Sequence, residues 1–335
     1  TGTFQSTDFN VQTGGQIEIL GPFEVVDQIT SSGDGSPNSR VAVLSGGRVQ
    51  GGTLTGDANT PFQIRGGALG GNAQTTSVDG ALTFSTGTLG GALGVTNNGA
   101  DFVFSRDEAT GTALIDGLLT NQNRVRHGAS NVFLNELAAI VNAGGAIYEI
   151  IAEAGGSGLL PSGSSSGLRT FTNKGTVESH ADFIIGNASA AQNVQFINDA
   201  GSVLDIQDGE LTMAAETTYQ DSTIRITKSP GGTGRLIQTG PATFAGVNEI
   251  EIAGAADLSL WELTPAHGRV TIRADGLLTQ EAQGQIFVPD QSTLDLLLLD
   301  DTTHLINVSG VGVALGAGSS LNWSGNVKLQ SGELA

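Results

Sequence analysis

The sequence predicts an all-β protein, a parallel β-helix (solenoid) of roughly 15 short-strand turns if each turn takes about 22 residues. Three observations lead to this prediction. Short stretches of alternating apolar and polar residues run along the chain, glycine or asparagine ends them, and similar phrases recur, as at Phe171 and Phe196. Alternation with a period of two is typical of half-buried strands, and a repeat of about 20 to 50 residues is typical of solenoids.

The strands are expected to be short and numerous. Residues 16–20 (QIEIL) show the alternation, and Gly21 follows them. Each such stretch is expected to form a strand of about three to five residues that a turn former ends. A pair of β-sandwiches is the alternative, but sandwich strands are usually longer, and Asn98–Gly99 is the one clear hairpin turn in the sequence. Further alternating stretches lie at 41–44, 101–104, 202–206, 222–226, 249–252 and 269–272.

The composition agrees with a folded repeat protein. The 335 residues include 50 glycines and 8 prolines without a Gly-X-Y period, which excludes collagen. An apolar fraction of 38% and a mean hydropathy of +0.03 argue against disorder. Because glycine and asparagine accept left-handed backbone conformations, they are expected at the corners where the chain passes between faces of the solenoid.

Two parts of the chain differ in their corner motifs. Residues 1–125 carry a Gly-Gly-x-apolar unit, and residues 126–335, expected to continue the same solenoid, carry an Asn/Gly corner. Asparagine side chains that stack at such corners are able to hydrogen-bond to one another. The Gly-Gly units begin at Gly46, Gly51, Gly66 and Gly90. The expected Asn/Gly corner positions are Asn142, Gly144, Asn173, Gly175, Asn198 and Gly201.

The stretch 130–154 (SNVFLNELAAIVNAGGAIYEIIAEA) tests this interpretation. A serine cap and the spacing of its apolar residues would suit a helix. Asn142 and two glycines interrupt such a helix, so we expect three strands instead, at 131–135, 139–142 and 146–151. The Gly- and Ser-rich segment at about 155–167 is expected to be a flexible loop, with a domain linker as the alternative.

Two phrases resemble a known superfamily. They are residues 196–206 (FINDAGSVLDI), followed by Gly209–Leu211, and residues 320–327 (SLNWSGNV). Both resemble the degenerate repeats of bacterial surface and secreted β-helix proteins, the adhesin, haemagglutinin and autotransporter-passenger-like superfamily. That resemblance implies a stalk or adhesive rod. Some members of the superfamily bind glycans, and a minority are polysaccharide lyases or glycosidases.

The charge of the chain excludes some partners. Fourteen Lys and Arg against 33 Asp and Glu give a formal net charge of −19, and the basic residues form no stripe. Nucleic acid and anionic lipid are therefore not expected as partners. No apolar run approaches the roughly 18 residues of a membrane helix, so membrane insertion by this chain is not expected. The acidic, cysteine-free and Gly/Thr/Ser/Asn-rich composition favours an extracellular or cell-surface location.

No enzyme is expected, and no catalytic or cofactor-binding residue is assigned. Of the motifs that polygalacturonase-like sites need, only the acidic pair Asp300–Asp301 has a match. Asp300 and Asp301 are also the metal-binding candidates, for calcium, which is the one cofactor left open. The histidines lack zinc-site spacing and are interpreted as surface positions, and the Trp and Tyr residues are expected to fill core or corner positions. These residues are His127, His180, His267, His304, Trp261, Trp323, Tyr148 and Tyr219.

The leading functional hypothesis is a non-enzymatic extracellular structural protein, a β-helical rod. Both ends of the sequence lie in strand patterns without an amphipathic cap, so we expect either a segment of a longer rod or copies that stack end to end. The rod would act as a surface stalk, an adhesin segment or a self-stacking filament subunit, with surface glycans or cell-surface receptors as further partners. The alternative is a polysaccharide-binding or polysaccharide-degrading β-helix protein.

Overall fold

In the computed structural model the described elements are β-strands, with no helix among them, which confirms the predicted all-β class and the parallel β-solenoid. Contacts divide the chain into two compact units, Thr1–Phe171 and Thr172–Ala335, each described by itself below. The composition boundary at 125/126 does not coincide with this division. Side chains are described within residues 15–251. The backbone is described for residues 2–11, 15–33, 40–58, 60–71, 74–99, 101–105, 112–128, 131–151, 157–163, 167–187, 194–226, 234–240, 242–252, 257–274, 277–288, 293–298, 304–306, 313–315, 320–324 and 327–329.

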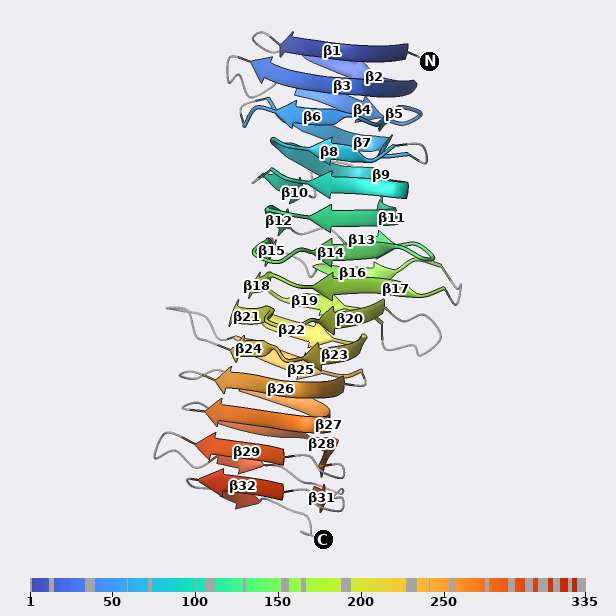
Figure 1. Ribbon diagram of the computed structural model, residues 1–335. Helices are drawn as coiled ribbons and strands as arrows, with labels where there is room; N and C mark the ends of the chain where they lie inside the picture. Colours follow the sequence, from blue (N-terminus) through green and yellow to red (C-terminus); the bar gives the residue numbers. More distant parts are fainter. Residues whose placement is uncertain are drawn as a thin grey trace. The chain divides into compact units, whose positions relative to one another are not determined.

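In the first unit each turn contributes strands to three stacks, and each strand pairs in parallel with its counterpart one turn along (Figure 1). One stack contains β2, β4, β7, β9, β10, β12 and β15, and longer strands such as β9 and β11 bend through corners to join two stacks. The strands are β1 (Gly2–Val11), β2 (Gln16–Ile19), β3 (Pro22–Gly33), β4 (Arg40–Leu44), β5 (Arg48–Gln50), β6 (Thr53–Gly56), β7 (Phe62–Leu69), β8 (Thr76–Val78), β9 (Leu82–Asn97), β10 (Phe102–Phe104), β11 (Ala113–Asn121), β12 (Arg124–His127), β13 (Asn131–Leu134), β14 (Ala139–Asn142), β15 (Ile147–Ile150) and β16 (Ser157–Pro161). Strand β17 (Arg169–Asn173) crosses the division between the units.

The core of the first unit consists of columns of buried side chains. In β10, Phe102 and Phe104 are fully buried, and Val103 between them is half-buried because successive side chains point to opposite faces of a strand. In-register parallel pairing places equivalent positions above one another, so Phe102 lies between Leu82 and Val125. Burying each such side chain stabilises the fold by about 1.5 to 3 kcal/mol.

The number of turns corrects the sequence prediction. In the first unit the stack of β1, β3, β5, β7, β9, β11, β13 and β16 follows about 8 turns in register. The prediction of roughly 15 turns for the whole chain is not confirmed, and the constant turn of about 22 residues that it assumed is wrong. In the structure the turn length varies. Ile115 pairs with Leu134, 19 residues on, and Leu134 pairs with Pro161, 27 residues on.

The glycines of the Gly-Gly units lie at strand ends and corners where the backbone is left-handed. The first glycine of each of the four units has a positive φ, at Gly46 (87°), Gly51 (77°), Gly66 (91°) and Gly90 (122°). At Gly91 (φ 123°) a Cβ atom would lie 2.5 Å from the carbonyl oxygen of Gly71 on the neighbouring turn. Glycine is therefore needed there for its conformation and for the close approach of the two turns.

The three strands expected within residues 130–154 are confirmed as β13, β14 and β15. The flexible loop expected at about 155–167 is wrong in its first half, because Ser157–Pro161 forms β16 and pairs with β13. Leu159 is fully buried there, so this leucine continues the core within the Gly/Ser-rich segment. Residues 155–156 and 164–166 lie outside the described residues.

The second unit repeats the same construction. Strands β18, β21, β24, β26, β27, β29 and β32 form one parallel stack (Figure 1), in which Val177, Leu204, Ile224 and Ile250 form a buried column. The strands are β18 (Thr176–His180), β19 (Phe183–Ile185), β20 (Val194–Asn198), β21 (Val203–Asp208), β22 (Glu210–Met213), β23 (Glu216–Gln220), β24 (Thr223–Ile226), β25 (Arg235–Gln238), β26 (Ala242–Ile252), β27 (Asp257–Ala274), β28 (Leu277–Val288), β29 (Thr293–Leu298), β30 (His304–Ile306), β31 (Val313–Leu315), β32 (Ser320–Ser324) and β33 (Val327–Leu329).

Candidate functional site

A charged cluster lies on the outer face of β12 and β15 in the first unit. Arg124 and Arg126 are half-exposed because they alternate with the buried Val125, and Glu149 lies on the next turn beside Arg126. Oε2 of Glu149 is 3.2 Å from Nε of Arg126 and 3.7 Å from Nε of Arg124. The Glu149 side chain is only 15% exposed, so this one carboxylate holds both guanidinium groups against the sheet.

The two arginines line a shallow, open depression of about 280 Å³. Its walls combine hydrogen-bond donors, an acceptor carboxylate and a small apolar surface. Such a mixture matches the hydroxyl groups and the C–H face of a sugar ring. The depression is lined by Asp101, Asn123, Arg124, Arg126, Gly145 and Ile147.

Beneath this face an aromatic column runs through the core. His127 is fully buried, which corrects the expectation that it is a surface residue. Its Nδ1 is hydrogen-bonded at 2.7 Å to the hydroxyl of Tyr148, also fully buried as predicted. Ring centroids are 5.4 Å apart from Phe104 to His127, 6.0 Å from His127 to Tyr148 and 5.0 Å from Tyr148 to Phe171. Burial raises the pKa of the Tyr148 phenol well above its ordinary value.

Buried asparagines form a hydrogen-bonded ladder at one corner of the first unit. Nδ2 of Asn97 donates to Oδ1 of Asn121 at 2.9 Å, and Nδ2 of Asn121 donates to Oδ1 of Asn142 at 2.7 Å. Each of the three amides also donates to a backbone carbonyl of the turn region, and all three are fully buried. The ladder therefore satisfies corner carbonyls that the strand pairing leaves open. Gly144 is exposed in the turn after Asn142.

The second unit has an equivalent arrangement. Nδ2 of Asn173 donates to Oδ1 of Asn198 at 2.7 Å and to the carbonyl of Val203 at 3.0 Å, and both asparagines are fully buried. Gly175 follows Asn173, and its N–H donates to Oδ1 of Asn173. Gly201 occupies an exposed turn with φ of 76°.

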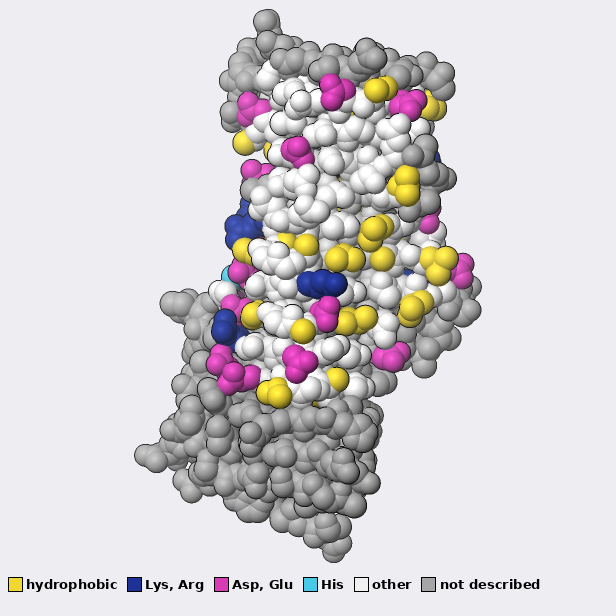
Figure 2. All heavy atoms as spheres, viewed as in Figure 1, with side chains coloured by type: hydrophobic (Ala, Val, Ile, Leu, Met, Phe, Trp, Pro, Cys, Tyr) yellow, Lys and Arg dark blue, Asp and Glu magenta, His cyan; other side chains and the backbone are white. Residues whose placement is uncertain are grey.

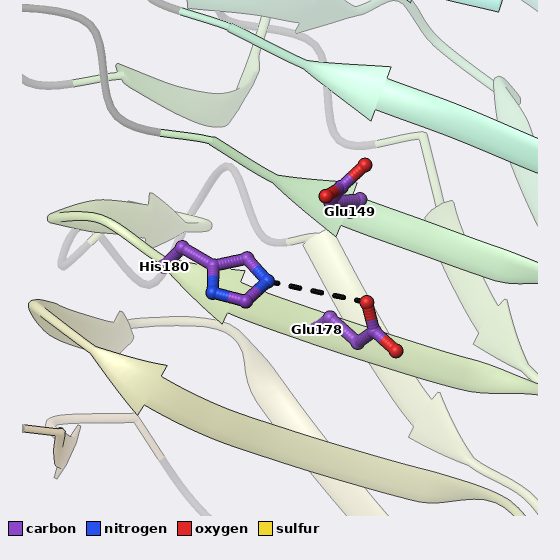
Figure 3. A group of neighbouring side chains, drawn as sticks. All are labelled: Glu149, Glu178 and His180. Carbon is purple, nitrogen blue, oxygen red and sulfur yellow. Dashed lines mark ion pairs between the residues drawn. The ribbon is translucent and has the colours of Figure 1, made fainter. Parts of the chain in front are cut away.

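A histidine and a carboxylate lie side by side on the outer face of the second unit. Glu178 and His180 both belong to β18 and alternate with the buried Val177 and Ser179 (Figure 3). Nε2 of His180 is 4.0 Å from Oε2 of Glu178, and the two side chains are 32% and 22% exposed. An imidazole nitrogen and a carboxylate are the donor types that transition-metal ions bind.

The calcium candidates Asp300 and Asp301 lie outside the described residues, so the structure does not place them. The same is true of the side chains of Trp261, Trp323, His267 and His304. Tyr219 is buried in the core as predicted and stacks on Phe244 with ring centroids 4.7 Å apart.

The sequence did not indicate the arginine-lined depression or two of the ladder asparagines. A signal for the depression exists in the alternation Arg124-Val125-Arg126, which places both arginines on one face. Asn97 and Asn121 each follow an alternating strand, as Asn142 does, but Asn121 lacks the glycine two or three residues later that marks the expected corners.

Acidic side chains lie scattered on the face drawn in Figure 2, and most of its described surface is neutral. Among the described residues, no helix has the length and hydrophobicity to cross a lipid bilayer. No family model, curated protein or solved structure shows significant similarity to this chain.

Proposed function

We propose that the chain is a non-enzymatic structural protein, a β-solenoid that serves outside the cell or at its surface as a stalk, an adhesin segment or a self-stacking filament subunit. The resemblance of residues 196–206 and 320–327 to the repeats of bacterial surface β-helix proteins agrees with this proposal.

The observation that carries the proposal is that hydrogen bonds connect each turn to the next within each unit. Backbone pairs join neighbouring turns on three faces of the first unit, and Asn97, Asn121 and Asn142 join them through side chains at a buried corner. Buried hydrogen bonds between polar side chains strengthen one another in a low dielectric. A solenoid of this kind resists extension because many hydrogen bonds between turns must break together.

Electron microscopy of the purified full chain over a wide concentration range tests the filament variant of the proposal. Fibres that lengthen with concentration are expected if copies stack, because strand edges add to one another through the same backbone hydrogen bonds. Single particles at every concentration would overturn self-stacking. Single-molecule extension tests the stalk variant, which predicts stepwise resistance as successive turns are pulled away.

Polysaccharide binding is the second candidate function, favoured by the depression at Arg124 and Arg126. Glu149 fixes both guanidinium groups, so little side-chain freedom is lost when a sugar binds. Asp101 supplies a carboxylate acceptor at the same depression, and Ile147 supplies apolar surface. Recognition of sugar hydroxyls by such paired donors and acceptors needs no deep cavity.

A glycan array probed with the full chain tests this second candidate. Arg124→Ala combined with Arg126→Ala is expected to abolish any binding found. Arg225→Ala is the matched control, because Arg225 has a similar exposure of 47% and pairs with Glu251 in the second unit. Binding that survives the double variant, or is lost equally in the control, contradicts assignment to the depression.

A further inference from the structure

We propose that one corner of the first unit binds a cationic amphipathic segment of another protein. The binding surface combines a ridge of leucines on successive turns with two exposed carboxylates, those of Asp116 and Glu136. This inference goes beyond the structural function proposed above and does not depend on it. The leucine ridge consists of Leu93, Leu118, Leu137 and Leu168.

Strand register brings the first three leucines together. Leu118 is half-buried in β11 and pairs with Ala139 of β14, two residues after Leu137. Leu118 and Leu137 line one shallow depression of about 250 Å³. A Cβ atom on Gly94 would lie 2.8 Å from the Cβ atom of Leu118, so Leu118 adjoins the part of β9 that contains Leu93.

Leu168 extends the ridge by one more turn. The N–H of Thr170 donates to the carbonyl of Ala138 at 3.0 Å, which places Leu168 near Leu137. Neighbouring turns lie about 4.8 Å apart, so the four leucines span about 14 Å. Leu93 and Leu168 are 47% and 57% exposed, and Figure 2 shows hydrophobic side chains gathered over β11 and β14. Contiguous exposed apolar surface with a polar rim is typical of a site that binds another molecule.

Leu137 is exposed at a conformational cost. It is 74% exposed, and its φ of 66° lies in the left-handed region, which is unfavourable for residues other than glycine. Its turn is closed by a hydrogen bond of 3.0 Å from the N–H of Ala138 to the carbonyl of Asn135. In two turns closed in the same way, glycine takes this place, with φ of 80° at Gly145 and 76° at Gly201. Neither burial nor backbone conformation accounts for a leucine here, whereas contact with a bound segment does.

The charge beside the ridge favours a cationic occupant. Asp116 and Glu136 line the same depression, and none of its lining residues is Lys or Arg. Oδ1 of Asp116 accepts a hydrogen bond of 2.7 Å from Nδ2 of Asn135, which holds this carboxylate in place. Lys and Arg side chains lay their apolar stems along leucines while their charged ends reach carboxylates. The depression therefore fits a basic side chain that projects from an apolar segment.

An amphipathic helix presents both features along the whole ridge. Apolar residues at positions i, i+3, i+4 and i+7 form one stripe, and Lys or Arg flank it. About ten helical residues cover the span of about 14 Å, because each residue adds about 1.5 Å. Such a segment matches the leucine ridge in length, polarity and charge.

A second copy of this chain matches the ridge less well. A symmetric dimer would bring Asp116 and Glu136 of one copy toward the same carboxylates of the other. Each copy also carries a formal net charge of −19, so the approach of two copies is opposed by repulsion. Charge therefore separates the two occupants.

Fluorescence anisotropy with the full chain and a labelled synthetic helical peptide tests the proposal. The peptide is built from leucine and lysine, with its leucines on one face, and one peptide is expected to bind per chain. Leu137→Gly and Leu168→Ala are each expected to weaken binding by at least about 10-fold, because a buried leucine contributes about 1.5 to 3 kcal/mol. Leu20→Ala is the matched control and is expected to bind as the unchanged chain does, since Leu20 is 63% exposed outside the ridge.

Thermal unfolding separates lost binding from lost folding. Leu137→Gly is expected to unfold at the same temperature as the unchanged chain or higher, because glycine accepts the left-handed backbone that leucine strains. Glu136→Gln is expected to weaken binding by up to about 5-fold and to lower its salt dependence, since an exposed ion pair contributes little. Glu18→Gln, at an exposed carboxylate of β2, is its control.

Three results would overturn the proposal. The first is a failure of the patterned peptide to bind, and the second is equal binding of a scrambled peptide of the same composition, which would show general attraction to an acidic chain. The third is binding that Leu137→Gly and Leu168→Ala leave unchanged. Sedimentation of the unchanged chain alone adds a check, because self-association that both leucine variants abolish would assign the ridge to a second copy instead.

Discussion

Replacement of Asn121 by alanine tests whether the asparagine ladder stabilises the solenoid. Asn121 is fully buried and makes four hydrogen bonds: it donates to Asn142 at 2.7 Å and to the carbonyl of Ile147 at 2.8 Å, and it accepts from Asn97 at 2.9 Å and from the N–H of Asn123 at 3.2 Å. Asn97 keeps a bond to a backbone carbonyl after the change, whereas the carbonyl of Ile147 and the N–H of Asn123 lose theirs.

The expected loss follows from these bonds. A buried hydrogen bond contributes about 1 kcal/mol net, and each group left unsatisfied adds about 1 to 3 kcal/mol, so Asn121→Ala is expected to destabilise the turn by about 3 to 6 kcal/mol. Asn123→Ala is the control. Asn123 is exposed and its side chain donates one bond, to the carbonyl of Asn98 at 3.0 Å, so its loss is expected to stay below about 1 kcal/mol.

Hydrogen exchange followed by peptide mass spectrometry measures this loss locally. Peptides from β11 to β15 are expected to exchange much faster in Asn121→Ala and to remain protected in Asn123→Ala, because exchange of core strands reports the free energy of opening. Equal protection in both variants, with a difference below about 1 kcal/mol, would refute the claim that the ladder stabilises the corner.

Three further predictions concern other positions of the first unit. Because burial raises the folded-state pKa of Tyr148, the contribution of this phenol to stability is expected to be constant below pH about 10. Above that pH it is expected to fall by up to about 1.4 kcal/mol per pH unit, as only the unfolded phenol ionises. Urea unfolding at several alkaline pH values checks this, and an equal fall in Tyr148→Phe would contradict it. Gly91→Ala is expected to destabilise the folded chain by more than about 2 kcal/mol, because the backbone there is left-handed and the new Cβ atom would collide with a carbonyl. Gly145→Ala is the control, since Gly145 has a φ of 80° but open space where the Cβ atom would lie, and it is expected to lose only about 1 to 2 kcal/mol. Thermal unfolding of the two variants measures both losses. Arg169→Lys is expected to lower the free energy of unfolding by about 2 to 4 kcal/mol. The buried guanidinium donates hydrogen bonds to three backbone carbonyls at 2.7 to 3.1 Å, in a geometry that an ammonium group does not reproduce. Urea unfolding that is unchanged in this variant would contradict the role of the guanidinium.

The local features of the fold were predictable. Alternation gave the three strands within 130–154, and the Gly-Gly units marked positions where the backbone proves left-handed, as at Gly46 and Gly90. Both signals depend on only a few neighbouring residues, so they can be recognised in the sequence without knowing which distant residues pack against them.

Composition was a poorer guide where a few residues outweighed their neighbours. The Gly/Ser-rich segment suggested a loop, yet Leu159 is fully buried in β16. Packing against the apolar column of the neighbouring turn buries enough area to order a strand whose residues have a weak intrinsic β-propensity. His127 was misjudged for the same kind of reason, since its surroundings on other turns decide its burial.

By itself the sequence determined that the chain is a parallel solenoid, where many of its short strands lie and which residue types occupy its corners. Only the tertiary structure decided which residues meet across turns, because the number of residues per turn varies, from 19 at Ile115 to 28 at Phe183. A side chain's neighbour on the next turn therefore cannot be found by adding a fixed repeat. The pairing of Arg126 with Glu149, and of Glu178 with Asp205, depends on that register, which long-range backbone hydrogen bonds and core packing fix together.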